Sequence, residues 1–289
     1  MAFRTVIVDS HSKLEYSLEY LVYRTVNETK RIFLDEIHTL IIQSTAVSLT
    51  SALISELSKR KIKVIFCDEK KNPVSELAPY YNAHNSSGRV FEQMNWNDSI
   101  KDRVWKEIIF QKIRNQATSL FRKNKKDQYN QLIDYANNIE QGDITNREGH
   151  AAKIYFNFVY FEGFTRDKDC FLNACLNYGY TILLSQFNRA ITSSGYLTQV
   201  GIHHKNEYNQ FNLSCDLIEP FRFLIDDFVE QLNENGDWKE KIIEILNKEV
   251  EIDGKKQTVT NAINVYSQSV FNALENNDPS VIKFVKNDI

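Results

Sequence analysis

The chain has 289 residues, a formal net charge of −3, 42% apolar residues and 25% charged residues, which is typical of a globular protein of one or two domains. Only 9 glycines and 4 prolines occur, so the composition favours long helices over a turn-rich all-β fold. No apolar run approaches the ~20 residues of a membrane span, and residues 1–6 lack a signal-peptide layout. We therefore expect a cytoplasmic protein without membrane contact. The four cysteines show no paired spacing, which argues against a zinc site and for reduced thiols.

Residues 4–67 predict a compact β-rich unit. Runs rich in β-branched and aromatic residues, separated by polar breaks, are typical of short strands, and they fall at 4–9, 20–24, 31–34, 39–43 and 63–67. Thr50 or Ser51 can cap a helix before the last of them. Polar residues are scattered here, so we expect this unit to form a two-fold interface rather than an active site.

The segment that follows predicts a connector. Two of the four prolines and a polar cluster lie between Asp68 and Gly88. From Met94 the pattern is helical, apart from a hairpin or tight turn at Asp253-Gly254. We expect an α+β fold with a small N-terminal β-rich dimerisation domain (1–72), a connector (73–92) and a larger all-helical C-terminal catalytic domain (93–289).

Positive charge is concentrated in one segment. Residues 101–126 hold nine Lys or Arg and two acids, a local balance of +7. This indicates a basic patch for a polyanion, with Arg122, Lys123, Lys125 and Lys126 as the nucleic-acid-binding candidates. The alternative is a solvated helix face followed by a basic loop.

A helix start at Thr145 carries the first candidate ligand. Thr145 and Glu148 have the spacing of a capping box, and Ala151, Ile154 and Tyr155 follow at helical spacing. Glu148 is therefore either a helix cap or a metal ligand.

A second carboxylate-rich segment extends from Gly201 to Glu219. Asp216 and Glu219 are three residues apart, so they share one side of a helix or form another capping box. His203 and His204 adjoin, so at most one of them is expected to be a ligand. One imidazole and two carboxylates suit Mn²⁺ or Mg²⁺, which can polarise a phosphate oxygen and orient an attacking hydroxyl. Beside the basic segment, these residues indicate phosphodiester chemistry.

Several motifs resemble one family, the CRISPR-associated endonuclease/integrase that inserts new spacers. They are residues 146–152, 177–180, Gly201-x-x-His204 and residues 216–222. The connector motif Pro79-Tyr80-Tyr81, with His84-x-Ser86-Ser87, resembles the type II subgroup. The resemblance implies an N-terminal β-domain that dimerises and a C-terminal helical domain that holds the metal.

The resemblance also implies roles and partners. Glu148, His204 and Glu219 would be the metal-ligating catalytic residues, with Asp216 supporting them and no role assigned to His203. Many family members have aspartate where Glu219 stands. The implied partner is a small ferredoxin-like CRISPR protein, whose central dimer is flanked by two integrase dimers in a heterohexamer. The 3′-hydroxyls of a double-stranded prespacer would attack the repeat array, together with the type II effector nuclease and an accessory protein.

Three functions remain open at this point. A metal-dependent DNA integrase would act by transesterification, whereas a structure-selective DNA endonuclease would use water as the nucleophile with the same metal. A non-catalytic dimeric DNA-binding scaffold would use Glu148 and Glu219 only as caps.

Overall fold

The computed structural model describes residues 4–79, 83–161 and 163–287. The chain divides into two compact units, residues 1–84 and 85–289. Tyr80 and Tyr81 of the connector motif lie outside the described residues. The division falls within the predicted connector, but much of that segment is regular: it begins with strand β8 (Pro73–Glu76) and ends in helix α2 (Ser86–Met94).

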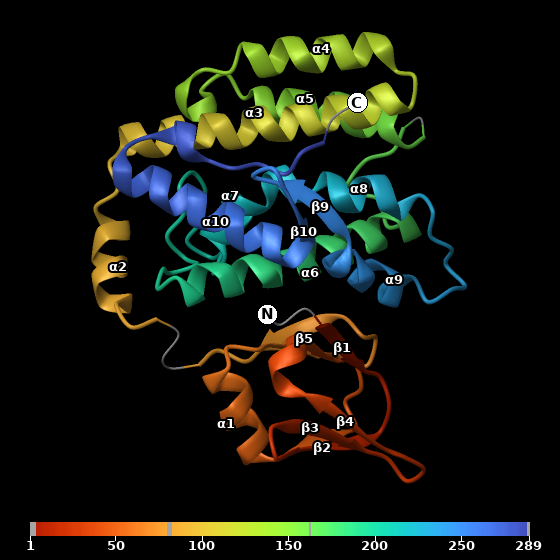
Figure 1. Cartoon of the computed structure of the whole chain (residues 1–289). Helices are drawn as coiled ribbons and strands as arrows, with labels where there is room; N and C mark the ends of the chain where they lie inside the picture. The colour runs from red at the N-terminus through yellow and green to blue at the C-terminus, as the bar shows by residue number, and fades with distance from the viewer. Residues whose placement is uncertain (1–3, 80–82, 162, 288–289) are drawn as a thin grey trace. The chain divides into compact units, whose positions relative to one another are not determined.

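The first unit contains two four-stranded sheets and one helix (Figure 1). One sheet has the order β1-β5-β7-β8, formed by β1 (Arg4–Val8), β5 (Ile37–Ile42), β7 (Lys63–Cys67) and β8. The other has the order β4-β3-β2-β6, formed by β2 (Ser12–Ser17), β3 (Tyr20–Arg24), β4 (Thr29–Phe33) and β6 (Val47–Leu49). A 3₁₀ turn, η1 (Leu34–Glu36), precedes β5, and helix α1 (Ser51–Lys59) precedes β7.

The apolar core of this unit explains its arrangement. Strand β5 is buried along its whole length, because it lies between β1 and β7 in the sheet and both of its faces are covered. Leu14, Leu40 and Leu53 bring β2, β5 and α1 into one apolar cluster. Thr50 caps α1 by accepting from the Leu53 backbone N–H, as predicted. Strands β2, β6 and β8 were not predicted, because they are short or rich in Ser, Lys and Glu.

The second unit is helical apart from one hairpin. Its α-helices are α2, α3 (Asp98–Arg122), α4 (Lys126–Asn137), α5 (Arg147–Val159), α6 (Phe171–Ser193), α7 (Asn212–Ile218), α8 (Phe223–Val229), α9 (Trp238–Glu244) and α10 (Val259–Asn276). Its 3₁₀ turns are η2 (Gln141–Asp143), η3 (Glu219–Phe221), η4 (Ile245–Asn247) and η5 (Pro279–Val281). The α+β fold class is confirmed.

The hairpin β9 (Glu249–Ile252) and β10 (Lys255–Thr258) is an exception to the predicted all-helical domain. Asp253 and Gly254 turn the chain with φ of 53° and 67°. Positive φ at both positions is what a two-residue hairpin loop requires, so the predicted turn is present.

Helix α3 is the central element of the second unit. It packs against α4 and α5 and also contacts α7, α8 and α10 (Figure 1). Its buried residues extend from Ile100 to Leu120, and Lys112 is among them. Across the part of the chain that the structure describes, no helix is long and apolar enough to cross a bilayer.

Candidate metal centre

The start of α5 directs Glu148 toward α3. The N-cap is Asn146, whose side chain accepts from the Gly149 N–H at 3.1 Å. The Asp143 carboxylate accepts from the N–H groups of Arg147 and Glu148 at 2.8 and 3.0 Å. The predicted capping box of Thr145 and Glu148 is therefore wrong, because Asp143 and Asn146 already satisfy these N–H groups.

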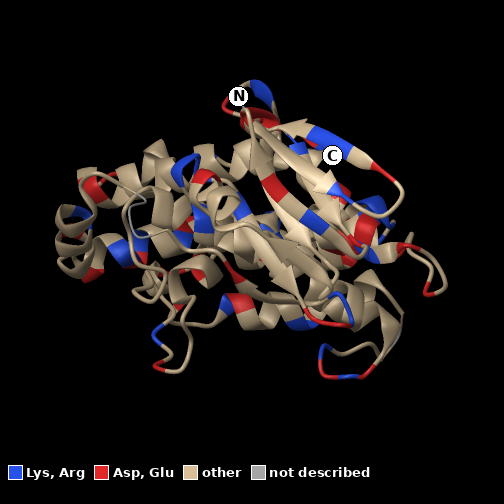
Figure 2. Cartoon of the chain, turned by 90° about the horizontal axis from the view of Figure 1, so that it is seen from below, with Lys and Arg blue, Asp and Glu red and all other residues tan. Residues whose placement is uncertain are grey.

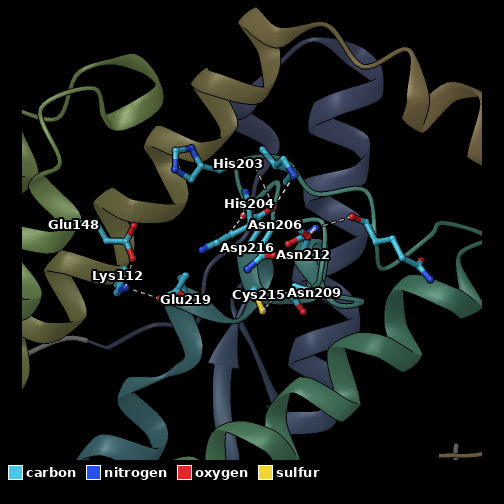
Figure 3. Close-up of polar contacts among 12 residues, drawn as sticks. Lys112, Glu148, His203, His204, Asn206, Asn209, Asn212, Cys215, Asp216 and Glu219 are labelled. Atoms are coloured by element: carbon cyan, nitrogen blue, oxygen red, sulfur yellow. Dashed lines mark hydrogen bonds and ion pairs between the residues drawn. The ribbon is translucent and has the colours of Figure 1, made fainter. Parts of the chain in front are cut away.

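Lys112 joins the two glutamates that were predicted to bind metal. Its Nζ lies 2.6 Å from Glu148 Oε1 and 2.5 Å from Glu219 Oε2 (Figure 3). Burial alone would lower the pKa of Lys112, but the carboxylates of Glu219 and Glu148 outweigh burial and raise it. Lys112 is therefore a charged ammonium held between two carboxylates.

Glu219 has a second cationic partner, Arg222. Arg222 Nε and Nη2 each donate to one oxygen of Glu219, both at 2.9 Å. The guanidinium also stacks over Tyr180 on α6, 4.5 Å from the ring centroid. Burial would raise the pKa of Glu219, but Arg222 and Lys112 hold it well below its usual range. Glu219 is therefore ionised although only 4% of it is exposed.

Asp216 organises the loop that carries the histidines. It is fully buried within α7 and accepts from the backbone N–H groups of Ile202, His203 and His204 at 2.5, 3.1 and 3.1 Å. A Cβ at Gly201 would lie 2.7 Å from Asp216 Oδ2, so only glycine allows this close approach. The capping alternative for Asp216 is wrong, because Phe211 is the N-cap of α7.

Asp216 also sets the orientation of His204. His204 Nδ1 lies 2.6 Å from Asp216 Oδ1, so Nδ1 carries a proton and neutral His204 presents its Nε2 lone pair. The hydrogen bond to Asp216 raises the pKa of His204; burial opposes it, and the charges of Asp216, Glu219 and Glu148 add to it. His204 is thus within electrostatic reach of both glutamates.

Trp105 on α3 contacts both histidines, whose own rings meet edge to face with centroids 5.8 Å apart. The ring of His203 stacks on Trp105 with centroids 4.3 Å apart and planes 2° apart, whereas His204 meets the same indole edge-on at 5.6 Å. The adjoining histidines therefore face different directions, as expected. Trp105 and Lys112 are site residues that sequence reasoning missed. The sequence signal that could have indicated them is their seven-residue spacing, which places Trp105 and Lys112 on one face of α3.

The donor set fits a hard divalent cation. Glu148, Glu219 and Nε2 of His204 could hold Mg²⁺ or Mn²⁺, which prefer carboxylate ligands and accept imidazole. Lys112 shows that a cation is accommodated where the two carboxylates meet. Within the described ranges, no three His, Cys, Asp or Glu side chains are gathered closely enough to form a complete metal-binding group.

The predicted basic patch is partly neutralised. Arg122 pairs with Asp227 at 3.4 Å, and Lys123 pairs with Glu230. Lys125 and Lys126 are exposed at the turn into α4. Basic and acidic residues are interspersed along the helices (Figure 2). The role of these four cations in binding nucleic acid remains a prediction.

The fold and the site together define a class of protein: a small β-rich unit followed by a helical unit in which two glutamates meet at one lysine, with a histidine within electrostatic reach of both. The sequence profile of the family described as "CRISPR associated protein Cas1" matches residues 5–264, and the chain belongs to this family. The CRISPR-associated endonuclease Cas1 of Neisseria meningitidis serogroup C is 32% identical over 242 residues, which cover 84% of this chain and 80% of that protein. The CRISPR-associated endonuclease Cas1 1 of Francisella tularensis subsp. novicida is 28% identical, with 83% of each chain covered.

Solved structures share the fold. A casposase bound to its integration product superposes with a TM-score of 0.75 at 18% identity and covers 95% of this chain and 91% of that chain. A Cas1 protein from Thermotoga maritima gives a TM-score of 0.73 at 18% identity, with 94% and 97% covered. A Cas6-RT-Cas1–Cas2 complex contains a chain with a TM-score of 0.75 at 17% identity, covering 99% of this chain and 36% of that chain.

Proposed function

We propose that this chain is a metal-dependent DNA integrase of CRISPR adaptation. It joins the 3′-hydroxyl of a prespacer strand to a phosphodiester of the repeat array by transesterification. The observation that carries the proposal is the convergence of Glu148 and Glu219 on one cation beside His204. The endonuclease names of the relatives support nuclease chemistry, and the casposase with its integration product supports strand joining in a related fold.

Different residues of this chain would bind the metal, orient the histidine and position the glutamate. Glu148, Glu219 and His204 Nε2 would hold Mg²⁺ or Mn²⁺, which when bound polarises the phosphate and stabilises the charge that develops on it. Asp216 keeps the His204 proton on Nδ1, so that Nε2 faces the reacting groups. Arg222 keeps Glu219 ionised and immobile through two parallel hydrogen bonds.

Partners follow from the same proposal. The solved complex that names both Cas1 and Cas2 supports a Cas2 partner. We propose that this partner is small and ferredoxin-like, and that this chain would form a heterohexamer with it around double-stranded prespacer and repeat DNA. In a type II system the effector nuclease and an accessory adaptation protein would take part. The N-terminal unit would form the homodimer, and a monomer at micromolar concentration by light scattering would contradict this.

DNA binding would involve Arg122, Lys123, Lys125 and Lys126. Their replacement by Ala should make the slope of log affinity against log salt shallower by ~0.9 for each phosphate that the protein no longer neutralises. An unchanged slope would show that these residues are only solvated.

Strand joining itself is tested with labelled DNA. The chain and its small partner would be incubated with a 3′-hydroxyl duplex and a repeat-containing duplex, in Mn²⁺ or with a chelator. Strands longer than either substrate, formed only with metal, support the integrase. Shorter strands alone would indicate the endonuclease, and no product under any condition would favour the scaffold. A duplex with 3′-dideoxy ends is the control, because it removes the attacking hydroxyl.

A further inference from the structure

Lys112 is the central group of the site that the proposed function leaves without a role. It lies in the middle of α3, is 8% exposed, and touches two of the three proposed ligands. With Arg222 it supplies two positive charges beside the two carboxylates of Glu148 and Glu219. These two positive charges balance the negative charges of Glu148 and Glu219, so repulsion between the two glutamates is offset in the metal-free chain.

The position of the ammonium overlaps with that of a metal ion. Mg²⁺ bound to the same two carboxylate oxygens would lie about 2.0–2.1 Å from each of them. Lys112 Nζ lies 2.6 and 2.5 Å from these oxygens. Two cations cannot share this point, because their repulsion is strong where water is excluded.

The two cationic side chains differ in how firmly they are held. Arg222 is fixed by two parallel hydrogen bonds to Glu219 and by its stacking on Tyr180. Lys112 is a single point charge on a flexible four-carbon stem. Lys112 is therefore the cation that can move away from Glu219 while Arg222 keeps its hydrogen bonds to the same carboxylate.

We propose that Lys112 is an internal cation that exchanges with the metal ion. Without metal, its ammonium holds Glu148 and Glu219 together; when metal binds, the ammonium withdraws from these oxygens. This inference rests on the proposed function, since it requires that Glu148 and Glu219 bind metal. It predicts that the chain binds metal less tightly than its ligands alone would allow.

The test compares Mn²⁺ binding in the intact chain and in Lys112→Met, which has a similar length and no charge. Isothermal titration should show that Lys112→Met binds Mn²⁺ about tenfold to a hundredfold more tightly, because the competing charged hydrogen bonds are gone. The metal-free variant should melt at a lower temperature than the wild type, and Mn²⁺ should raise its melting temperature more. Lys101→Met is the matched control: Lys101 lies on α3 and pairs with Asp98, and its loss should leave Mn²⁺ affinity unchanged.

A second measurement needs no variant. An amine-acylating reagent followed by mass spectrometry should modify Lys112 slowly in metal-free wild type and faster at saturating Mn²⁺. This decides the matter if Lys112→Met does not fold.

The outcomes separate the two proposals. Equal or weaker Mn²⁺ binding by folded Lys112→Met, or unchanged acylation of Lys112 at saturating Mn²⁺, would overturn the exchange and leave the integrase proposal standing. If Mn²⁺ binds neither protein, the metal centre is wrong and the exchange fails with it.

Discussion

The two units of the chain differ in how many charged side chains they bury. Among the described residues of the N-terminal unit, Lys63 is the one Lys, Arg, Asp or Glu that is buried, and it pairs with the half-buried Glu76. In the N-terminal unit, Arg60 pairs at the surface with Glu19 and Asp35, whose side chains are 53% and 60% exposed. The C-terminal unit instead buries charged residues within its helices, namely Lys112, Asp143, Asp216, Glu219 and Asp226. Burying a charge is costly and adds little stability even when it is paired. The difference indicates that the first unit is organised by packing and the second by the needs of a reaction.

The apolar cores support the same contrast. Leu14, Leu40 and Val64 are fully buried in the first unit, where the sheets and α1 meet. The second unit has a larger apolar core, yet α3 places Lys112 among its buried residues. Charge at that position is a feature of the site rather than of the fold.

The largest effect should come from Glu148→Gln. Glutamine keeps the length of the side chain but removes the charge that a hard cation requires. We expect strand joining in Mn²⁺ to fall by at least ~100-fold. The chain should stay folded and bind DNA, because Lys112 keeps its contact with Glu219. Product yields beside a thermal melt would measure this.

The matched control for this change is Glu140→Gln, an exposed acid on the approach to the same helix. It should join strands at the wild-type rate. Near-normal joining by Glu148→Gln would contradict the metal-ligand role of Glu148, and the buried Lys112 that pairs with it would then lack the catalytic context on which the comparison rests.

Asp216→Asn should have the next largest effect. The carboxylate accepts three backbone N–H groups and His204 Nδ1, whereas an amide offers one oxygen and two N–H groups that face other donors. We expect the free energy of unfolding of the C-terminal unit to fall by about 3 kcal/mol. Joining should fall about 10- to 100-fold as His204 loses its orientation.

Urea unfolding and the joining assay would test Asp216→Asn, with the exposed Asp237→Asn as the control. A variant that loses stability while joining normally would show that Asp216 supports the fold alone. The conclusion that charge in the second unit serves a reaction would then apply to Glu148 and Glu219 but not to Asp216 and the loop that carries the histidines.

Asp226 should make the stability of the folded chain depend on pH. Its side chain is buried and accepts from Tyr180 Oη. Burial raises the pKa of Asp226 to about 7, Asp227 adds to the rise, and Tyr180 and Arg222 oppose it. The folded chain therefore holds a proton here that the unfolded chain releases near pH 4. This contribution to stability is complete below about pH 4 and is lost as the pH rises through about 7.

The Asp226→Asn variant lacks this titration. At pH 8 it should be about 2 kcal/mol more stable than the wild type, and at pH 5 the gap should shrink by a similar amount. Thermal or urea unfolding at several pH values would measure both curves. Parallel curves would mean that Asp226 stays ionised in the folded chain.

Much of the fold was predictable because its signals are local. Strand β7 begins and ends as predicted, since its β-branched and aromatic residues stand between polar breaks. Strand β2 was missed because Ser, Lys and Glu alternate with its few apolar residues. Its pairing with β3 and β6 compensates for a weak local preference, and such pairing cannot be read from a short window.

The site was predictable in its residue types but not in its contacts. Glu148, His204, Asp216 and Glu219 were selected from spacing and motif. Both capping boxes were wrong, because the spacing that suggested them does not show which side chain reaches an N–H group first. Lys112 looked like one more cation of a basic segment, and its bond to Glu148 joins residues 36 apart in the chain.

The smallest effect should come from the surface of the first unit. Arg60 is one-fifth exposed. Its partners Glu19 and Asp35 are mostly in water, and its third partner, the half-buried Glu56, lies farther away at 3.6 Å. Exposed ion pairs contribute ~0–1 kcal/mol and weaken as salt screens them. Arg60→Gln should therefore lower the free energy of unfolding of the N-terminal unit by at most about 1 kcal/mol in 0.1 M salt, and by less in 1 M salt. Lys30→Gln, which removes another exposed pair with Glu28, is the matched control and should behave alike. A loss of several kcal/mol that 1 M salt leaves unchanged would mean that the first unit also depends on a desolvated ionic network, and the contrast between the two units would no longer hold.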